Sequence, residues 1–383
     1  MPFFSKGLSP RLTLILDVQS SVVRGSLVAF TKNAVPEVIS TAEASIAWKP
    51  RGDSAFLIKV TLKAVEQVVG TIMSSHHELA HEKNSVLPRT IDSLHFALSS
   101  PWIVSQAKVF KTSFAKETPA SRSDIERAMA EERARLIPVD QQTEVTVIEE
   151  KIFDVRLNGY SVADWMGKPA RNLEASYAMS IAGTRMIERF RQACGQTVPA
   201  NRMSFHSSLL LQFIGMRTVM PERASYGLFH VHGELTDIAI MNRGGCTFFG
   251  SMPEGVRTVV RKVANRSGSD DLTADSLLTL YAAGHIDEIH SKKDRELASE
   301  IAEDWSRDAS RLASASTMPA IIYMSASAHD DYFSEALAKS YTQARVVRLS
   351  IDDLVPHVRF APRARRQRLP ALYAIAIRSL SVI

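Results

Sequence analysis

Histidines are the first candidates for chemistry in this 383-residue chain, because imidazole nitrogens bind transition metals and exchange protons near neutral pH. His76, His77 and His81 have spacings that would place two imidazoles on one face of a helix. Beyond Glu78 and Glu82, no nearby set of carboxylates or cysteines completes a metal site. We interpret the cluster as the end of an exposed helix, with a metal-binding pair as the alternative, and expect no metal.

Nucleophilic catalysis has no support in the sequence. The serine pairs that begin at Ser99 and Ser207 lie outside any Gly-x-Ser-x-Gly segment. The two cysteines, Cys194 and Cys246, are too few for a cysteine-built zinc site, and their scarcity suits a reducing compartment. We assign no catalytic residue.

The composition is that of a soluble globular protein, with 45% hydrophobic and 23% charged residues and a mean hydropathy of −0.05. No apolar run approaches the roughly 20 residues that span a bilayer. The first residues lack the small-residue cleavage site of a signal peptide. We therefore expect a cytoplasmic protein without a transmembrane helix.

Positive charge is concentrated near the C-terminus. The net charge is +5, and five arginines lie within ten residues: Arg359, Arg363, Arg365, Arg366 and Arg368. A surface loop is the first interpretation, and contact with anionic lipid, at the inner membrane face, is the second. Nucleic acid is not expected, because Phe360 is the only aromatic residue interleaved with these arginines.

The order of predicted elements contains an internal duplication. A strand, turn and strand over residues 11–30 recur over 226–241, and each unit is followed by a third strand. A helix is predicted over 54–78, and the second half continues through a helix at 293–313, a strand at 320–324 and a last helix at 370–380. Between them, residues 108–183 read as strand, helix, strand, strand, with Ser123 as the expected helix cap.

Three polar turns in this order carry a resemblance to the actin-like ATPase superfamily. Asp17-Val18-Gln19-Ser20-Ser21 stands at the family's first phosphate loop, the segment from His230 to Asp237 at the second, and Met324-Ser325-Ala326-Ser327 at the adenosine loop. The resemblance implies an α/β fold of two actin-like, ribonuclease-H-like domains around a cleft near Asp17, Gly233 and Ser325.

The insertion resembles the small strand-helix-strand-strand (SHS2-type) domain of the FtsA and PilM proteins. The sequence Asn158-Gly159-Tyr160 and the later Gly167-Lys168 are most similar to FtsA. The resemblance implies a first domain of residues 1–103 with 184–225 and an inserted domain of 104–183. The second domain would cover 226–383, with a helical subdomain at about 255–315.

The loops depart from the family pattern where phosphate oxygens must approach backbone amides and a carboxylate must hold magnesium. Gln19, His232, Glu234 and the Ser325-Ala326 pair replace glycines, and His230 replaces an aspartate. We expect a degenerate ATPase without cofactor, with weak binding of ATP and magnesium as the alternative. The nucleotide-site candidates are Asp17, Gln19, Ser20, Ser21, Gly233, Thr236, Asp237, Ser325 and Ala326.

The resemblance further implies a filament-forming adaptor or scaffold in bacterial cell division. Its partners would be further copies of itself and a tubulin-like division protein or an envelope-machine protein. Peripheral membrane contact would come from the Met1–Phe4 tip, the arginine loop or a partner. The alternatives are a PilM-like pilus-assembly scaffold and an active ATPase of the same fold.

Overall fold

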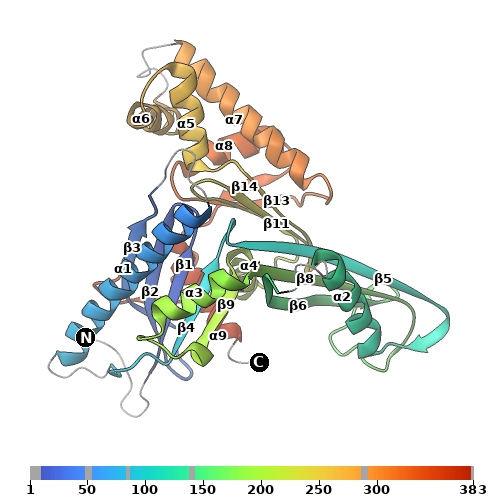
Figure 1. Cartoon of the computed structure of the whole chain (residues 1–383). Helices are drawn as coiled ribbons and strands as arrows, with labels where there is room; N and C mark the ends of the chain where they lie inside the picture. Colours follow the sequence, from blue (N-terminus) through green and yellow to red (C-terminus); the bar gives the residue numbers. More distant parts are fainter. Residues whose placement is uncertain (1–9, 48–53, 83–86, 138–142, 286–291, 381–383) are drawn as a thin grey trace. The chain divides into compact units, whose positions relative to one another are not determined.

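The computed structural model describes residues 10–47, 54–82, 87–137, 143–285 and 292–380. The chain divides into two compact units (Figure 1). Unit 1 takes Met1–Ile103, Arg185–Glu222 and Leu349–Ile383, and unit 2 takes Val104–Thr184 and Arg223–Arg348. The apolar Met1–Phe4 tip lies outside the described residues. None of the helices in the described ranges is long and apolar enough to cross a membrane.

Unit 1 is built on a six-stranded sheet in the order β15-β3-β2-β1-β4-β9. The predicted strand, turn and strand are present as an antiparallel hairpin. Strand β4 pairs in parallel with β1, and β9 pairs in parallel with β4. The strands are β1 (Arg11–Val18), β2 (Val22–Phe30), β3 (Glu37–Ser45), β4 (Ser93–Leu98), β9 (Met203–Ser207) and β15 (Arg359–Phe360). The helices are α1 (Ser54–His81), α3 (Thr184–Cys194), α4 (Ser208–Val219) and α9 (Arg368–Leu380).

Helix α1 packs directly on β2 because Gly25 has no side chain. A Cβ at Gly25 would lie 2.5 Å from Cγ1 of Val68 and 2.6 Å from Cδ1 of Ile72. The buried positions of α1 recur at helical spacing, from Thr61 to His76. The helix expected over 54–78 is thus confirmed, and it extends to His81.

The C-terminal segment corrects the predicted domain boundary. The sequence places residues 349–383 in the second domain, but Leu349–Ile383 groups with unit 1. Strand β15 pairs with β3, and α9 packs on α4 so closely that a Cβ on Gly215 would meet Leu372 at 2.7 Å. The local pattern of α9 does not identify its partner, because its continuous run of buried residues from Leu369 to Ile377 could be buried in either unit.

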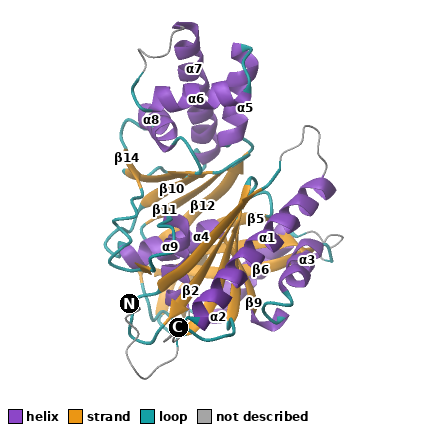
Figure 2. Cartoon of the chain, turned by 90° about the vertical axis from the view of Figure 1, so that its left-hand side faces the viewer, coloured by secondary structure: helices purple, strands orange, loops and turns teal. Residues whose placement is uncertain are grey.

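Unit 2 contains a five-stranded sheet in the order β12-β11-β10-β13-β14, with the helices α5–α8 gathered together beside it (Figure 2). The first three strands form an antiparallel meander, and β13 and β14 add in parallel. The strands are β10 (Tyr226–Val231), β11 (Thr236–Asn242), β12 (Gly245–Met252), β13 (Ile321–Ala326) and β14 (Arg345–Arg348). The helices are α5 (Val256–Ser267), α6 (Asp271–Ala282), α7 (Lys292–Ala313) and α8 (Asp330–Ser340).

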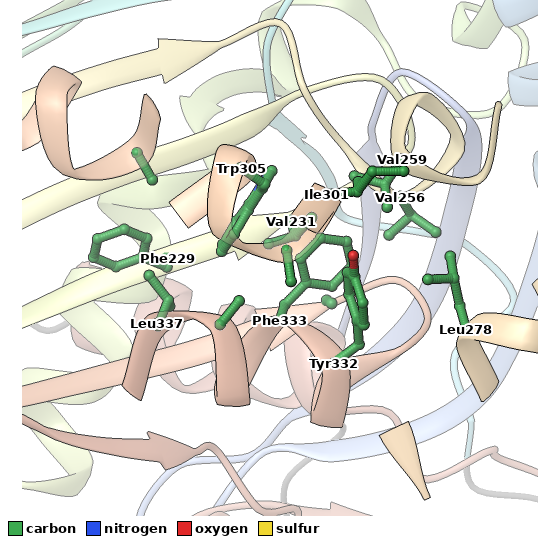
Figure 3. Packing of buried hydrophobic residues seen from close by; sticks show 14 of the residues in the cluster. Phe229, Val231, Val256, Val259, Leu278, Ile301, Trp305, Tyr332, Phe333 and Leu337 are labelled. Atoms are coloured by element: carbon green, nitrogen blue, oxygen red, sulfur yellow. The ribbon is translucent and has the colours of Figure 1, made fainter. Parts of the chain in front are cut away.

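The core of this part of unit 2 joins the sheet to the helices. Figure 3 shows Trp305 of α7 and Phe333 of α8 packed against Phe229 and Val231 of β10. The Trp305 and Phe333 rings make an edge contact with centroids 4.9 Å apart. The Trp305 Nε1–H also donates to Oγ1 of Thr236, 3.3 Å away, so the core is bonded to the first residue of β11.

The inserted segment forms its own four-stranded sheet in the order β5-β8-β6-β7, with α2 packed on one face. The expected strand-helix-strand-strand order is present. Ser121 is the cap in place of Ser123, because its side chain and that of Asp124 form a reciprocal capping box. The elements are β5 (Ile103–Pro119), α2 (Arg122–Leu136), β6 (Val145–Leu157), β7 (Tyr160–Ser161) and β8 (Pro169–Gly183).

This inserted sheet belongs to unit 2, although it interrupts the sequence of the first half. Ser176 of β8 donates a hydrogen bond of 2.7 Å to the carbonyl of Cys246 in β12. Arg156 of β6 donates one of 3.0 Å to the carbonyl of Arg243. These bonds attach the insertion to the edge of the five-stranded sheet.

Candidate nucleotide site

The first predicted phosphate loop follows β1, and its carboxylate, that of Asp17, is paired with other side chains of the protein. Asp17 is buried, and its Oδ2 accepts a hydrogen bond of 2.8 Å from the side-chain amide nitrogen, Nε2, of Gln19. The Arg24 guanidinium of β2 lies 3.6 Å from the same oxygen. Buried carboxylates need a partner of opposite charge. Arg24 therefore supplies, from within the protein, the positive charge that balances Asp17.

Helix α9 completes this arrangement from the C-terminal segment. The Tyr373 hydroxyl lies 3.4 Å from Oδ1 of Asp17 and 2.7 Å from Oγ of Ser208 in α4. Complete burial and the negative charge of Asp17 raise the pKa of Tyr373 well above its ordinary value, so the phenol stays protonated. Both oxygens of Asp17 thus have partners within unit 1.

The remaining residues of the first loop are held as a tight turn. The Gln19 amide N–H donates to the Val22 carbonyl, and the Ser21 carbonyl accepts from Ile46. The indole of Trp102 donates to the Gln19 carbonyl at 3.0 Å. Gln19, Ser20 and Ser21 are all buried. These hydrogen bonds within unit 1 therefore fix the conformation of the loop.

The second loop, between β10 and β11, is folded onto the start of α5. The amides of Val256 and Arg257 donate to the carbonyls of His232 and Gly233, at 2.9 and 2.7 Å. The first amides of a helix are the donors that a bound phosphate would use. A Cβ at Gly255 would lie 2.1 Å from the His232 carbonyl oxygen, so only glycine permits this approach.

The acidic side chains of the second loop are paired in the same way. Glu234 forms a two-pronged ion pair with Arg261 of α5, with Nη2–Oε2 at 2.5 Å. Asp237 accepts from the Ser251 hydroxyl at 2.6 Å and lies 3.3 Å from Nε2 of His232. Burial lowers the pKa of Arg257, and Glu234 opposes that shift. Glu234 is therefore already paired with a cation of its own unit, Arg261.

The adenosine loop lies beside the second loop, because β10 and β13 are neighbouring parallel strands with His230 opposite Ser325. Nδ1 of His230 is 3.0 Å from Oγ of Ser325. The Ser327 amide donates to the Val231 carbonyl, and the Ala326 amide donates to the Asp330 carboxylate at 2.6 Å. The strand end that would face a nucleotide base is thus bonded to α8.

The structure therefore brings together the second-loop and adenosine-loop candidates in unit 2 and holds the first-loop candidates in unit 1. In unit 2 these are Gly233, Thr236, Asp237, Ser325 and Ala326, and in unit 1 they are Asp17, Gln19, Ser20 and Ser21. Sequence reasoning missed Arg24, Arg261 and Tyr373. Arg24 had a local signal, because in a hairpin with so short a turn it must face Asp17 across the strands, as the register shows.

The arginine cluster is partly neutralised by acidic residues of unit 1. Arg363 contacts Glu78 and Glu82 at 3.7 and 3.1 Å, and Arg365 contacts Glu43 at 3.3 Å. Arg368 donates to the carbonyl of Leu349. The segment is a surface loop and a short strand, β15, with Arg359, Arg363, Arg365 and Arg366 exposed. Its capacity for anionic surfaces is reduced by these internal pairs.

Within the described ranges, no group of three or more metal-ligand side chains is close enough to hold an ion. At the loops, the carboxylates that would face magnesium have protein partners instead. The residues present do not fit a magnesium-nucleotide complex as they stand.

Comparison of the sequence with models of protein families and with curated proteins gives no match. Among solved structures, the chain is similar to PilM of the PilM-PilN type IV pilus biogenesis complex, with a TM-score of 0.60 at 12% identity, over 95% of this chain and 96% of that one. The nucleotide-free diol dehydratase-reactivating factor gives 0.48 at 8% identity, over 88% and 95%. The ethanolamine utilization protein EutJ from Carboxydothermus hydrogenoformans gives 0.47 at 10%, over 97% and 90%.

The protein therefore has the two-domain α/β fold of the actin-like ATPases. The PilM side of the expected resemblance is supported at the level of fold. Assignment to FtsA and to an SHS2-type insertion stays a prediction.

Proposed function

We propose that this chain is an actin-fold scaffold that does not hydrolyse ATP and that binds a protein partner at the inner face of the membrane. The observation that carries the proposal is the pairing of Asp17 with Arg24. A cation cannot be bound there without displacing a guanidinium that already balances the buried charge. The Glu234–Arg261 pair and the carbonyl-capped start of α5 support the same conclusion at the second loop.

The test is a measurement of nucleotide binding. Millimolar ATP with magnesium should leave the melting temperature nearly unchanged, because a ligand that does not bind the folded state adds no stability. Binding at micromolar Kd would instead add roughly 4 kcal/mol at a thousandfold excess, a shift of several degrees. Such a shift together with phosphate release would overturn the proposal and return the chain to the active ATPases.

A variant that opens both loops serves as the positive control. Arg24→Ala combined with His230→Asp, His232→Gly and Glu234→Gly removes the internal cation and restores the residue types of the family loops. Gain of ATP binding in this variant, and not in the unmodified chain, would locate the defect in these loops. Its circular dichroism must match that of the parent, since the change is large.

The partner belongs, in our proposal, to a pilus-assembly machine. PilM, the similar protein, is described in complex with PilN. We propose that this chain likewise binds a membrane-anchored assembly protein and reaches the membrane mainly through it, with the paired arginine loop adding little. Deletion of the gene should abolish surface pili while cells divide at normal length. Long undivided cells with normal pili would instead support the FtsA-like division role, with its filaments and tubulin-like partner.

A further inference from the structure

Helix α1 ends in a pair of exposed histidines. His77 and His81 are both exposed, and their ring centroids lie 4.4 Å apart. Neither ring has a hydrogen bond or ion pair with another residue in the part of the chain that the structure describes. The neighbouring His76, by contrast, is buried on the opposite side of the helix and bonded to the Pro88 carbonyl at 2.8 Å.

Other histidines are committed to protein partners. His95 pairs with His206, and His329 pairs with Asp275. His230 contacts the Ser325 hydroxyl, and His232 contacts the Asp237 carboxylate. The exposed rings of His77 and His81 therefore lie beside each other on the last turns of a helix.

We propose that His77 and His81 form a two-imidazole site for a transition metal of the Zn²⁺, Ni²⁺ or Cu²⁺ class, with water completing the coordination. Residues four apart lie one above the other on a helix. Two Zn–N bonds of about 2.05 Å at a tetrahedral angle place the nitrogens about 3.3 Å apart. Rings with centroids 4.4 Å apart reach that separation by rotation about their side-chain bonds.

The charges around the pair favour a cation. Glu78 lies in the last turn of α1 and Glu82 directly follows the helix, and both contact the guanidinium of Arg363. Two carboxylates are thus placed at the same end of α1 as the two imidazoles. Neutral imidazole selects Zn²⁺, Cu²⁺ and Ni²⁺ over the oxygen-seeking Mg²⁺ and Ca²⁺. The site is thus unrelated to the nucleotide loops and does not depend on the function proposed above.

The test is calorimetric titration of the untagged full chain with Zn²⁺ at pH 7.5. We expect one bound ion and no response to Mg²⁺. His77→Gln and His81→Gln should each weaken Zn²⁺ binding at least tenfold, roughly the minimum loss seen when even the outer shell of a metal site is altered. His357→Gln, at a half-buried histidine elsewhere in unit 1, is the matched control and should bind as the parent does.

A gain-of-function variant removes any ambiguity from misfolding. Ser74 is exposed three residues before His77, on the same side of α1, so Ser74→His adds a third imidazole and should tighten Zn²⁺ binding about tenfold or more. Unchanged affinity in His77→Gln and His81→Gln would overturn the proposal. An equal loss in His357→Gln, or no gain in Ser74→His, would do so as well.

Discussion

Asp17 and Arg24 face each other across the first hairpin, in register on β1 and β2, with a guanidinium nitrogen 3.6 Å from the carboxylate. The charge of Asp17 is balanced by a residue only seven positions away in the sequence. Because the charge is balanced within a single hairpin, the first loop can be stable without any ligand.

Removal of Arg24 should destabilise the protein more than removal of Asp17. Arg24→Ala leaves a buried carboxylate with only neutral partners, at a cost of up to about 3–5 kcal/mol. Asp17→Asn leaves Arg24, which also lies 3.7 Å from Glu43 and is partly exposed. The double variant should therefore be more stable than Arg24→Ala alone. Urea unfolding of all three measures this, and additive losses would contradict the coupling.

Gly255→Ala should lower the free energy of unfolding by about 3 kcal/mol or more, because the new methyl group would meet backbone atoms at 2.1–2.6 Å that cannot move aside. Gly70→Ala is the matched control. Gly70 lies in α1 with open space around its Cα, so alanine there should stabilise by about 0.5–1 kcal/mol. Chemical denaturation measures both changes. Equal small effects at the two glycines would mean that the second loop is not packed against α5.

Acid should weaken the fold through His95. Burial, and to a smaller extent the neighbouring His206, lower the pKa of His95 from 6.5 to about 3. Between these values the unfolded chain binds a proton that the folded chain does not, so stability is full above pH 6.5 and falls towards pH 3. The loss from this group is at most about 1.4 kcal/mol per pH unit.

His95→Gln should reduce this slope between pH 6.5 and 5, a range above the ordinary titration of carboxylates. Urea midpoints at a series of pH values measure it. His357→Gln is the control and should keep the slope of the parent. An unchanged slope in His95→Gln would show that His95 takes up a proton in the folded protein.

The arginine loop should bind anionic vesicles weakly until its internal partners are removed. Glu78→Gln with Glu82→Gln releases Arg363, and each basic residue near an anionic surface contributes about 1 kcal/mol, or roughly fivefold in affinity. Pelleting with phosphatidylserine vesicles at low salt should therefore increase. Glu296→Gln with Glu303→Gln on α7 changes the net charge equally without releasing Arg363. Equal increases in both variants would attribute the effect to net charge alone.

The sequence by itself determined the local elements and their order. Alternation and turn residues located the hairpins around Asp17 and Asn242, and helical periodicity located α1 and α7, because both signals depend on spacing within a short segment. The duplicated order predicted two related halves, and the resemblance carried by the three loops implied the actin-like fold. The residue types at these loops predicted that the glycines needed for phosphate were missing. These inferences need no contact between distant residues.

Only the tertiary structure shows which protein groups pair with the loop residues and which unit contains the C-terminal segment. The partners of Asp17 include Tyr373, and those of Ser325 include His230, across separations of 356 and 95 residues. The sequence of a mostly buried helix such as α9 does not identify the surface that buries it. The sequence around Arg261 likewise does not identify Glu234 as its partner. Both are settled only when packing brings the elements together, because burial and charge pairing are properties of neighbours in space.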